Sequence, residues 1–201
     1  MGCPRARPSP WISASATASV YSRGDAWMLF DVFPGKGDSE LGFKEKLPVF
    51  LEWALLRLKY PEQPVRVVLL AEPEKRATST RWHQQLNAFD ARFTRDDLGH
   101  RVERLLRLWQ IAQSETAWYF PGTSWAVASA KQGKARDEGE KRWQGSDHAS
   151  GERDYAPGYA RVLAQGVDLF AGQDWANLQG LAEVLRDCID FTDGDSEIDH
   201  D

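Results

Sequence analysis

An almost unbroken apolar run places the strongest restriction on how this chain can fold. Between Pro64 and Glu72 every residue except Arg66 is apolar, and most are Val or Leu. A short run of this kind, rich in β-branched residues, is typical of a strand whose sheet is covered on both faces. The run over residues 65–71 therefore predicts a mostly covered sheet, which needs neighbouring strands and helices.

The residues before this strand supply both kinds of neighbour. Residues 11–21 are rich in Ser, Thr and Val, residues 26–33 are apolar, and Arg23-Gly24-Asp25 between them predicts a tight turn. From Gly42 to Tyr60 the apolar residues recur at helical spacing, and Pro61 and Pro64 end that pattern. The order strand, strand, helix, strand indicates an α/β (α+β) fold with a short sheet.

The second half of the chain has helical patterns. An amphipathic stripe covers residues 98–112, and after Tyr119-Phe120-Pro121-Gly122 either Thr123 or Ser124 is placed to cap a long helix that ends near Trp143. A polar loop over 145–154 and two more helices, over 159–170 and 175–188, complete the pattern. The expected organisation is a disordered lead-in over 1–10, one domain over 11–190, divided into a core over 11–95 and a helical part over 96–190, and an acidic tail over 191–201.

Charge and composition limit the possible classes of protein. The net charge of −5 comes from 25 Lys and Arg against 30 Asp and Glu, but seven of the acidic residues follow Arg186, so residues 1–186 carry +2. No apolar run is long enough for a membrane span, and the first residues lack the apolar part of a signal peptide, so we expect a cytoplasmic protein. Cys3 and Cys188 have no spacing typical of a disulfide framework or a zinc site.

The motifs of common enzymes are missing from the sequence. There is no GxxxxGK[ST] phosphate loop, no GxSxG and no HExxH. A metal-dependent nuclease would need two carboxylates on adjacent strands and a [DE]-x-K motif, and [DE]-x-K occurs nowhere. We therefore expect no catalytic residue, metal or cofactor. The enzyme alternative is a nuclease with a migrated site, which would use Asp31 with Lys36, or Asp38 with Glu40.

Two groups of cations are candidates for contacts with DNA phosphates. Each has an alternative interpretation as a solvated helix face held by ion pairs, since acidic residues lie among the cations. One group is on the stripe-bearing helix and the other on the predicted long helix. The candidate residues are Arg101, Arg104, Arg107, Lys131, Lys134, Arg136, Lys141 and Arg142.

Four segments, in the same order and with similar gaps, resemble the C-terminal region of RecC, the gamma subunit of exodeoxyribonuclease V. They are residues 43–56 (FKEKLPVFLEWALL), 105–109 (LLRLW), 119–126 (YFPGTSWA) and 151–159 (GERDYAPGY). The resemblance covers about residues 20–190. It implies a degenerate restriction-endonuclease-like core that has lost its active site.

The resemblance also implies partners and a role. They would be RecB-like and RecD-like subunits and DNA, within the ATP-dependent helicase–exonuclease that acts in double-strand break repair and recombination. This chain has no counterpart of the long helicase-like portion of RecC, so Chi reading by the isolated chain is not expected. A remnant of a split gene is a further alternative.

Overall fold

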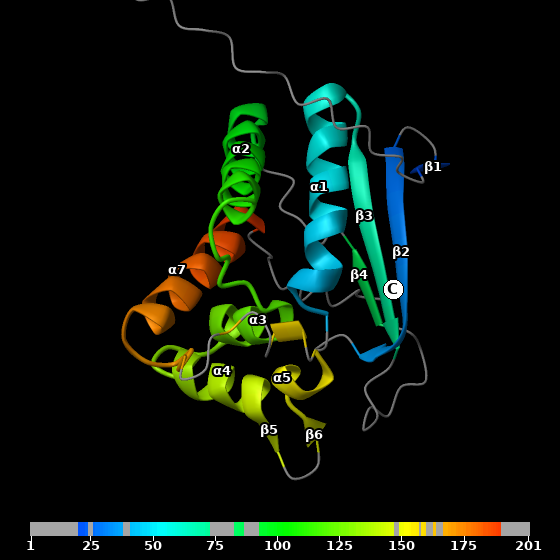
Figure 1. Cartoon of the computed structure of the whole chain (residues 1–201). Helices are drawn as coiled ribbons and strands as arrows, with labels where there is room; N and C mark the ends of the chain where they lie inside the picture. The colour runs from blue at the N-terminus through cyan, green and yellow to red at the C-terminus, as the bar shows by residue number, and fades with distance from the viewer. Residues whose placement is uncertain are drawn as a thin grey trace, which may run out of the picture.

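A four-stranded sheet lies at one side of the molecule and a group of helices at the other (Figure 1). The computed structural model describes residues 20–23, 26–37, 41–72, 83–86, 93–146, 149–156, 158–159, 163 and 167–189. The predicted lead-in over 1–10 and acidic tail over 191–201 lie outside these residues. The mixture of a short sheet with several helices confirms the predicted α/β class.

The strands follow one another across the sheet in chain order. They are β1 (Val20–Arg23), β2 (Ala26–Gly37), β3 (Val65–Glu72) and β4 (His83–Leu86). The pairs β1–β2 and β3–β4 are antiparallel, whereas β2 and β3 are parallel. The strands predicted over 26–33 and 65–71 are confirmed. The strand predicted over 11–21 falls mostly outside the described residues, and β4 was not predicted, because His83-Gln84-Gln85-Leu86 has no apolar pattern.

Helix α1 (Phe43–Lys59) crosses between the two parallel strands and covers one face of the sheet (Figure 1). Its apolar stripe buries Phe50 and Trp53 against Leu29 of β2 and Val67 of β3. The Trp53 indole N–H also donates to the Val65 carbonyl at 3.1 Å, so the aromatic side chain is buried with its polar atom satisfied. The predicted helix over 42–60 is confirmed.

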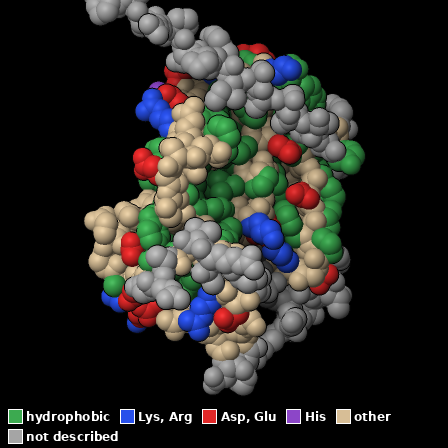
Figure 2. Space-filling model, in the orientation of Figure 1, with side chains coloured by type: hydrophobic (Ala, Val, Ile, Leu, Met, Phe, Trp, Pro, Cys, Tyr) green, Lys and Arg blue, Asp and Glu red, His purple; other side chains and the backbone are tan. Residues whose placement is uncertain are grey.

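The helical part follows the sheet. It comprises α2 (Arg95–Ala112), α3 (Pro121–Ser129), α4 (Ala135–Gln144), the short hairpin β5 (Gly145–Ser146) and β6 (Ala149–Ser150), α5 (Glu152–Tyr155) and α7 (Gly172–Ile189). Thr94 caps α2, because its hydroxyl accepts the Asp97 N–H at 3.2 Å. Figure 2 shows hydrophobic side chains gathered between α1 and α2.

In the described part of the chain, no helix combines the length and apolar character that crossing a membrane requires.

The prediction of one long helix from Thr123 or Ser124 to Trp143 is wrong. Helix α3 ends at Ser129, and α4 starts only at Ala135. Gly133, between them, has a φ of +78°, a left-handed conformation that glycine adopts without steric cost and that turns the chain back. The two helices then pack so closely that a Cβ on Gly139 would lie 2.7 Å from Val127 Cγ2.

The remaining predictions have mixed outcomes. The loop predicted over 145–154 contains the β5–β6 hairpin and α5, so it is more ordered than its polar composition indicates. The helix predicted over 159–170 lies largely outside the described residues. Helix α7 confirms the last predicted helix and buries Leu178 and Leu185.

Replacing Glu52 tests the packing of α1 on the sheet. Burial, and secondarily the nearby charge of Asp31, raises the pKa of the Glu52 carboxyl. The folded protein therefore holds this proton more tightly than the unfolded chain, and stability is lost as the pH rises from the ordinary Glu pKa of about 4.3 through the raised pKa of the folded protein. We expect Glu52→Gln to raise the melting temperature at neutral pH and to lose that gain in acid, where Glu52 is protonated in both states.

The matched control is Glu62→Gln in the exposed turn after α1, which should leave the melting temperature unchanged at both pH values. Calorimetry at the two pH values measures the difference. An equal gain for Glu52→Gln in acid and at neutral pH would show that the charge on Glu52 is not the cause.

Candidate functional site: a basic cleft

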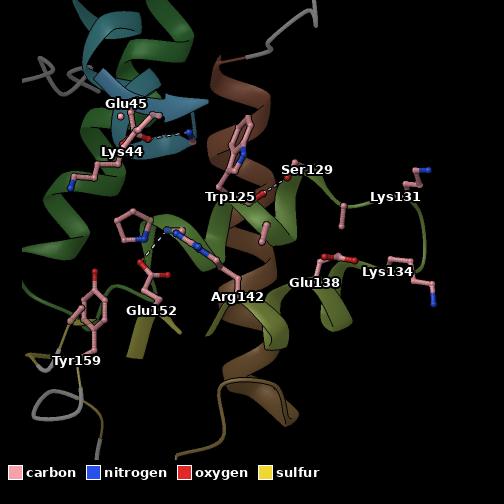
Figure 3. Close-up of a pocket in the computed structure, with 18 residues that line it drawn as sticks. Lys44, Glu45, Trp125, Ser129, Lys131, Lys134, Glu138, Arg142, Glu152 and Tyr159 are labelled. Carbon is pink, nitrogen blue, oxygen red and sulfur yellow. Dashed lines mark hydrogen bonds and ion pairs between the residues drawn. The ribbon is translucent and has the colours of Figure 1, made fainter. Parts of the chain in front are cut away.

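A cleft of about 1180 Å³ lies where the sheet meets the helical part. One wall is formed by the end of β2 and the start of α1, and the other by α3, the α3–α4 connection, α4 and α5 (Figure 3). Its cationic lining residues are Lys36, Lys44, Lys131, Lys134 and Arg142, and its acidic ones are Glu45, Glu138 and Glu152. The cleft opens at the carboxyl end of β2, which forms the parallel pair of this mixed sheet with β3; α/β proteins commonly bind ligands beyond the carboxyl ends of parallel strands.

The first wall is held by Glu45 in the first turn of α1. Its carboxylate accepts the Gly42 N–H at 3.0 Å and forms an ion pair with Lys36 of β2. Glu45 is buried, so its charge is taken up by the start of its own helix and by the strand. Lys44, the next residue back along α1, is exposed at the cleft.

The second wall is held by Glu152, which is only 3% exposed. One carboxylate oxygen accepts the Gly122 N–H at 3.0 Å, and the other accepts the Thr123 N–H at 2.6 Å and the Thr123 hydroxyl at 2.7 Å. Helix α3 starts at Pro121 after Phe120, which has no side-chain oxygen for capping. Glu152 therefore caps α3 from a distant part of the chain.

Arg142 of α4 lies on the same patch of backbone. A Cβ on Gly122 would lie 2.7 Å from Arg142 Nε and 3.2 Å from Glu152 Oε2, so the absence of a side chain at Gly122 leaves room for both groups. In Figure 3 the Arg142 side chain points along α3 toward Glu152. Tyr119 lies two residues before the start of α3. Burial is the main cause of the raised pKa of its hydroxyl, which therefore stays protonated.

Trp125 joins the two walls. It belongs to α3, and its ring packs edge-on against Phe43 of α1 with the ring centres 5.0 Å apart. The Lys46 ammonium lies 4.6 Å from the centre of the same ring, in cation–π contact. A Cβ on Gly42 would lie 3.0 Å from Trp125, so the start of α1 and the middle of α3 are in close contact.

The structure brings together some of the cations predicted on the long helix. Lys131, Lys134 and Arg142 line the cleft, with Lys131 and Lys134 at its outer end (Figure 3). Lys141 lines a smaller adjoining pocket of about 230 Å³. Arg136 lines neither pocket and pairs with Glu140 at 3.0 Å along α4.

The arginines predicted on α2 lie elsewhere and have partners within the protein. Arg101 donates to the carbonyls of Asp187 and Cys188 at the end of α7. Arg104 lies 3.9 Å from the Asp187 carboxylate, and Arg107 pairs with Glu103 at 2.6 Å. Arg101 thereby satisfies carbonyls that the last turn of α7 leaves without helical partners.

The structure describes only some of the residues that the nuclease alternative would use. Asp31 lies on β2 opposite Leu69 of β3, and Asp38 and Glu40 lie outside the described residues. Lys36 pairs with Glu45, not with Asp31. Within the described ranges, no three His, Cys, Asp or Glu side chains are grouped to hold a metal ion.

Sequence reasoning missed Lys44 and Glu152 as parts of the site. Lys44 carries no signal of its own, since a single lysine in the first turn of an amphipathic helix is ordinary. Glu152 lies in a polar stretch, and its contact with α3 spans 29 residues, so no local pattern marks it. One available signal is that Phe120-Pro121-Gly122 starts a helix without a capping side chain, which requires an acceptor from elsewhere.

No protein-family model, curated protein or solved structure matched the chain.

Replacing Glu152 tests the second wall. We expect Glu152→Gln to lower the free energy of unfolding by about 2 kcal/mol, because the amide keeps only one acceptor oxygen and turns an NH₂ group toward backbone donors. Glu138→Gln, an exposed carboxylate in the same cleft, should change stability by no more than about 0.5 kcal/mol. Urea denaturation followed by circular dichroism measures both, and equal losses would contradict the capping role of Glu152.

Proposed function

We propose that this protein is a non-catalytic, RecC-like module of exodeoxyribonuclease V that contacts DNA through the basic cleft. The observation that carries the proposal is that Lys131, Lys134 and Arg142 line one cleft together with Lys36 and Lys44. Phosphate backbones are bound chiefly by Lys and Arg, and cations on two walls suit a polyanion that passes between them.

Three of the four segments that resemble RecC meet around this cleft, which supports the proposal; the fourth, residues 105–109, lies on α2. Residues 43–56 form most of α1, residues 119–126 include the start of α3, and residues 151–159 include Glu152. Glu152 binds the start of α3, and Trp125 packs on Phe43. Three segments that are far apart in the sequence therefore form one structural unit, as expected if they belong to one ancestral site.

The sheet is compatible with a degenerate nuclease-like core. Such a site needs carboxylates on adjacent strands, and Asp31 faces an apolar residue, Leu69, on β3. The carboxylate that β3 does provide, Glu72, accepts the Gly35 N–H at 2.7 Å, where the register of β2 against β3 shifts between Phe33 and Gly37. We therefore favour a scaffold over an enzyme.

The exposed surface of the cleft is more basic than its composition indicates, because two of its three carboxylates, Glu45 and Glu152, are buried. Glu45 and Glu152 accept backbone N–H groups at the starts of α1 and α3. Only Glu138 is an exposed carboxylate among the lining residues, whereas Lys44, Lys131 and Lys134 are all exposed. Lys134 also has Asp137 at 3.3 Å, an exposed pair that a phosphate can replace at little cost.

Charge reversal in the cleft tests the DNA contact. We expect the triple variant Lys44→Glu, Lys131→Glu, Lys134→Glu to bind DNA at least about tenfold more weakly and to reduce the slope of log K against log salt by about three, one for each lost phosphate contact. Fluorescence anisotropy with labelled DNA over a salt series measures both quantities.

The matched control reverses the same number of charges away from the cleft, with Lys59→Glu, Arg66→Glu, Arg136→Glu. It should lower affinity much less, since it changes the net charge equally but leaves the cleft intact. Equal losses in the two triple variants would show that only net charge matters. An absence of DNA binding by the unchanged protein would refute the cleft as a DNA site.

Co-purification with RecB-like and RecD-like subunits from the same cell tests the partner part of the proposal. A stable complex is the expected result, and a monomer that binds neither subunit would contradict it.

Two measurements test the alternatives. Digestion of linear duplex DNA that depends on Mg²⁺ and is lost in Asp31→Ala would favour the nuclease alternative. The absence of a cooperative unfolding transition in calorimetry would favour a decayed gene product.

A further inference from the structure

The last two turns of α2, its projecting end, expose apolar side chains beside Leu105 and Leu108, which pack against the core. Residues 105–112 are Leu-Leu-Arg-Leu-Trp-Gln-Ile-Ala, whereas earlier in the helix Leu98 and Val102 are buried in the core. Leu106, Trp109 and Ile111 are 41%, 54% and 50% exposed. Large apolar side chains gathered on one exposed surface are typical of an interaction site, so this end of α2 is a candidate docking surface.

Exposed cations flank this surface. The side chains of Arg104 and Arg107 are 49% and 71% exposed, and their ion-pair partners, Asp187 and Glu103, are themselves exposed. Exposed pairs of this kind exchange partners readily. The surface therefore combines apolar side chains with two accessible guanidinium groups, a combination that fits a segment with both carboxylates and apolar residues.

The chain itself brings such a segment to this place. Arg101 of α2 holds the carbonyls of Asp187 and Cys188, so α7 ends beside α2, and residues 190–201 start from that point. Their sequence, Asp-Phe-Thr-Asp-Gly-Asp-Ser-Glu-Ile-Asp-His-Asp, has six carboxylates, no Lys or Arg, and two large apolar residues, Phe191 and Ile198.

The distances allow the contact. Ten residues along α2, from Arg101 to Ile111, span about 15 Å. A segment as long as residues 190–201 can extend to about 40 Å, so it reaches the whole projecting end of α2 with length to spare. A segment with only two large apolar residues cannot form a core of its own. These residues can be shielded from water only by a surface elsewhere on the protein.

We propose that residues 190–201 bind in cis to the projecting end of α2, with Phe191 and Ile198 on Leu106, Trp109 and Ile111 and with carboxylates at Arg104 and Arg107. Such a contact would cover the exposed apolar side chains and place carboxylates beside two arginines. This inference does not depend on the role of the basic cleft.

A spin-label experiment on the full chain tests the contact. Ser196→Cys carries the nitroxide, Cys3→Ser removes a competing thiol, and Cys188 is protected because it is buried and its thiol pKa is raised by burial. We expect the label to broaden the amide NMR signals of residues 105–112 beyond detection, with little effect on residues 131–134 in the cleft, and expect strong salt to reverse the broadening in part.

Paired variants give the specificity of the contact. Trp109→Ser with Arg107→Gln should restore the signals of α2, and both positions are exposed, so the fold is retained. Leu55→Ser with Lys59→Gln, an exposed apolar and cationic pair on α1, should leave the broadening unchanged.

Three results would overturn the proposal. Undiminished α2 signals in the labelled chain would show that the segment does not bind there. Broadening centred on residues 131–134 would place the segment at the cleft instead. Broadening that also occurs when spin-labelled chains are mixed with ¹⁵N-labelled chains that carry no nitroxide would show contact between two copies, not within one.

Discussion

A helix that starts inside a protein leaves its first N–H groups without partners, and the start of α3 is where this protein meets that problem most sharply. Phe120 provides no capping oxygen, Pro121 has no N–H, and the N–H groups of Gly122 and Thr123 both donate to Glu152. Helix α3 contacts α1, α4 and α7, so one buried carboxylate fixes the helix against which three others pack. The second wall of the cleft has its shape for the same reason.

The parallel pairing of β2 and β3 sets the other wall. Parallel neighbours need a crossover, and α1 provides it, which places the start of α1 close to the end of β2. Glu45 then reaches both Gly42 and Lys36, and Trp125 fills the space against Phe43. The cleft is thus a consequence of two helix starts that are each satisfied by a glutamate.

Patterns that depend on near neighbours predicted the fold well. The stripe of α1 and the apolar run of β3 are properties of single segments, and both elements appear within a residue or two of their predicted bounds. The break between α3 and α4 was missed because the residues on both sides have helical character and one positive φ, at Gly133, decides the turn. Of the candidate cations, sequence position alone could not separate Lys131 in the cleft from Arg101 at the end of α7, because the difference lies in contacts that span 87 residues.

Cations that look alike in the sequence therefore have different roles according to the groups that meet them. Arg101 donates to carbonyls at the end of α7, Arg136 pairs with Glu140 on its own helix, and Lys44 is exposed at the cleft. Glu45 already accepts the Gly42 N–H and pairs with Lys36, and Glu152 accepts three donors from the start of α3, so neither carboxylate has much capacity left for another cation. Five cations and three carboxylates line the cleft, and two of those carboxylates, Glu45 and Glu152, are buried at helix starts, so the groups exposed to a ligand are mainly cationic. Weakening either cap would expose a carboxylate to the cleft as well as loosen a helix.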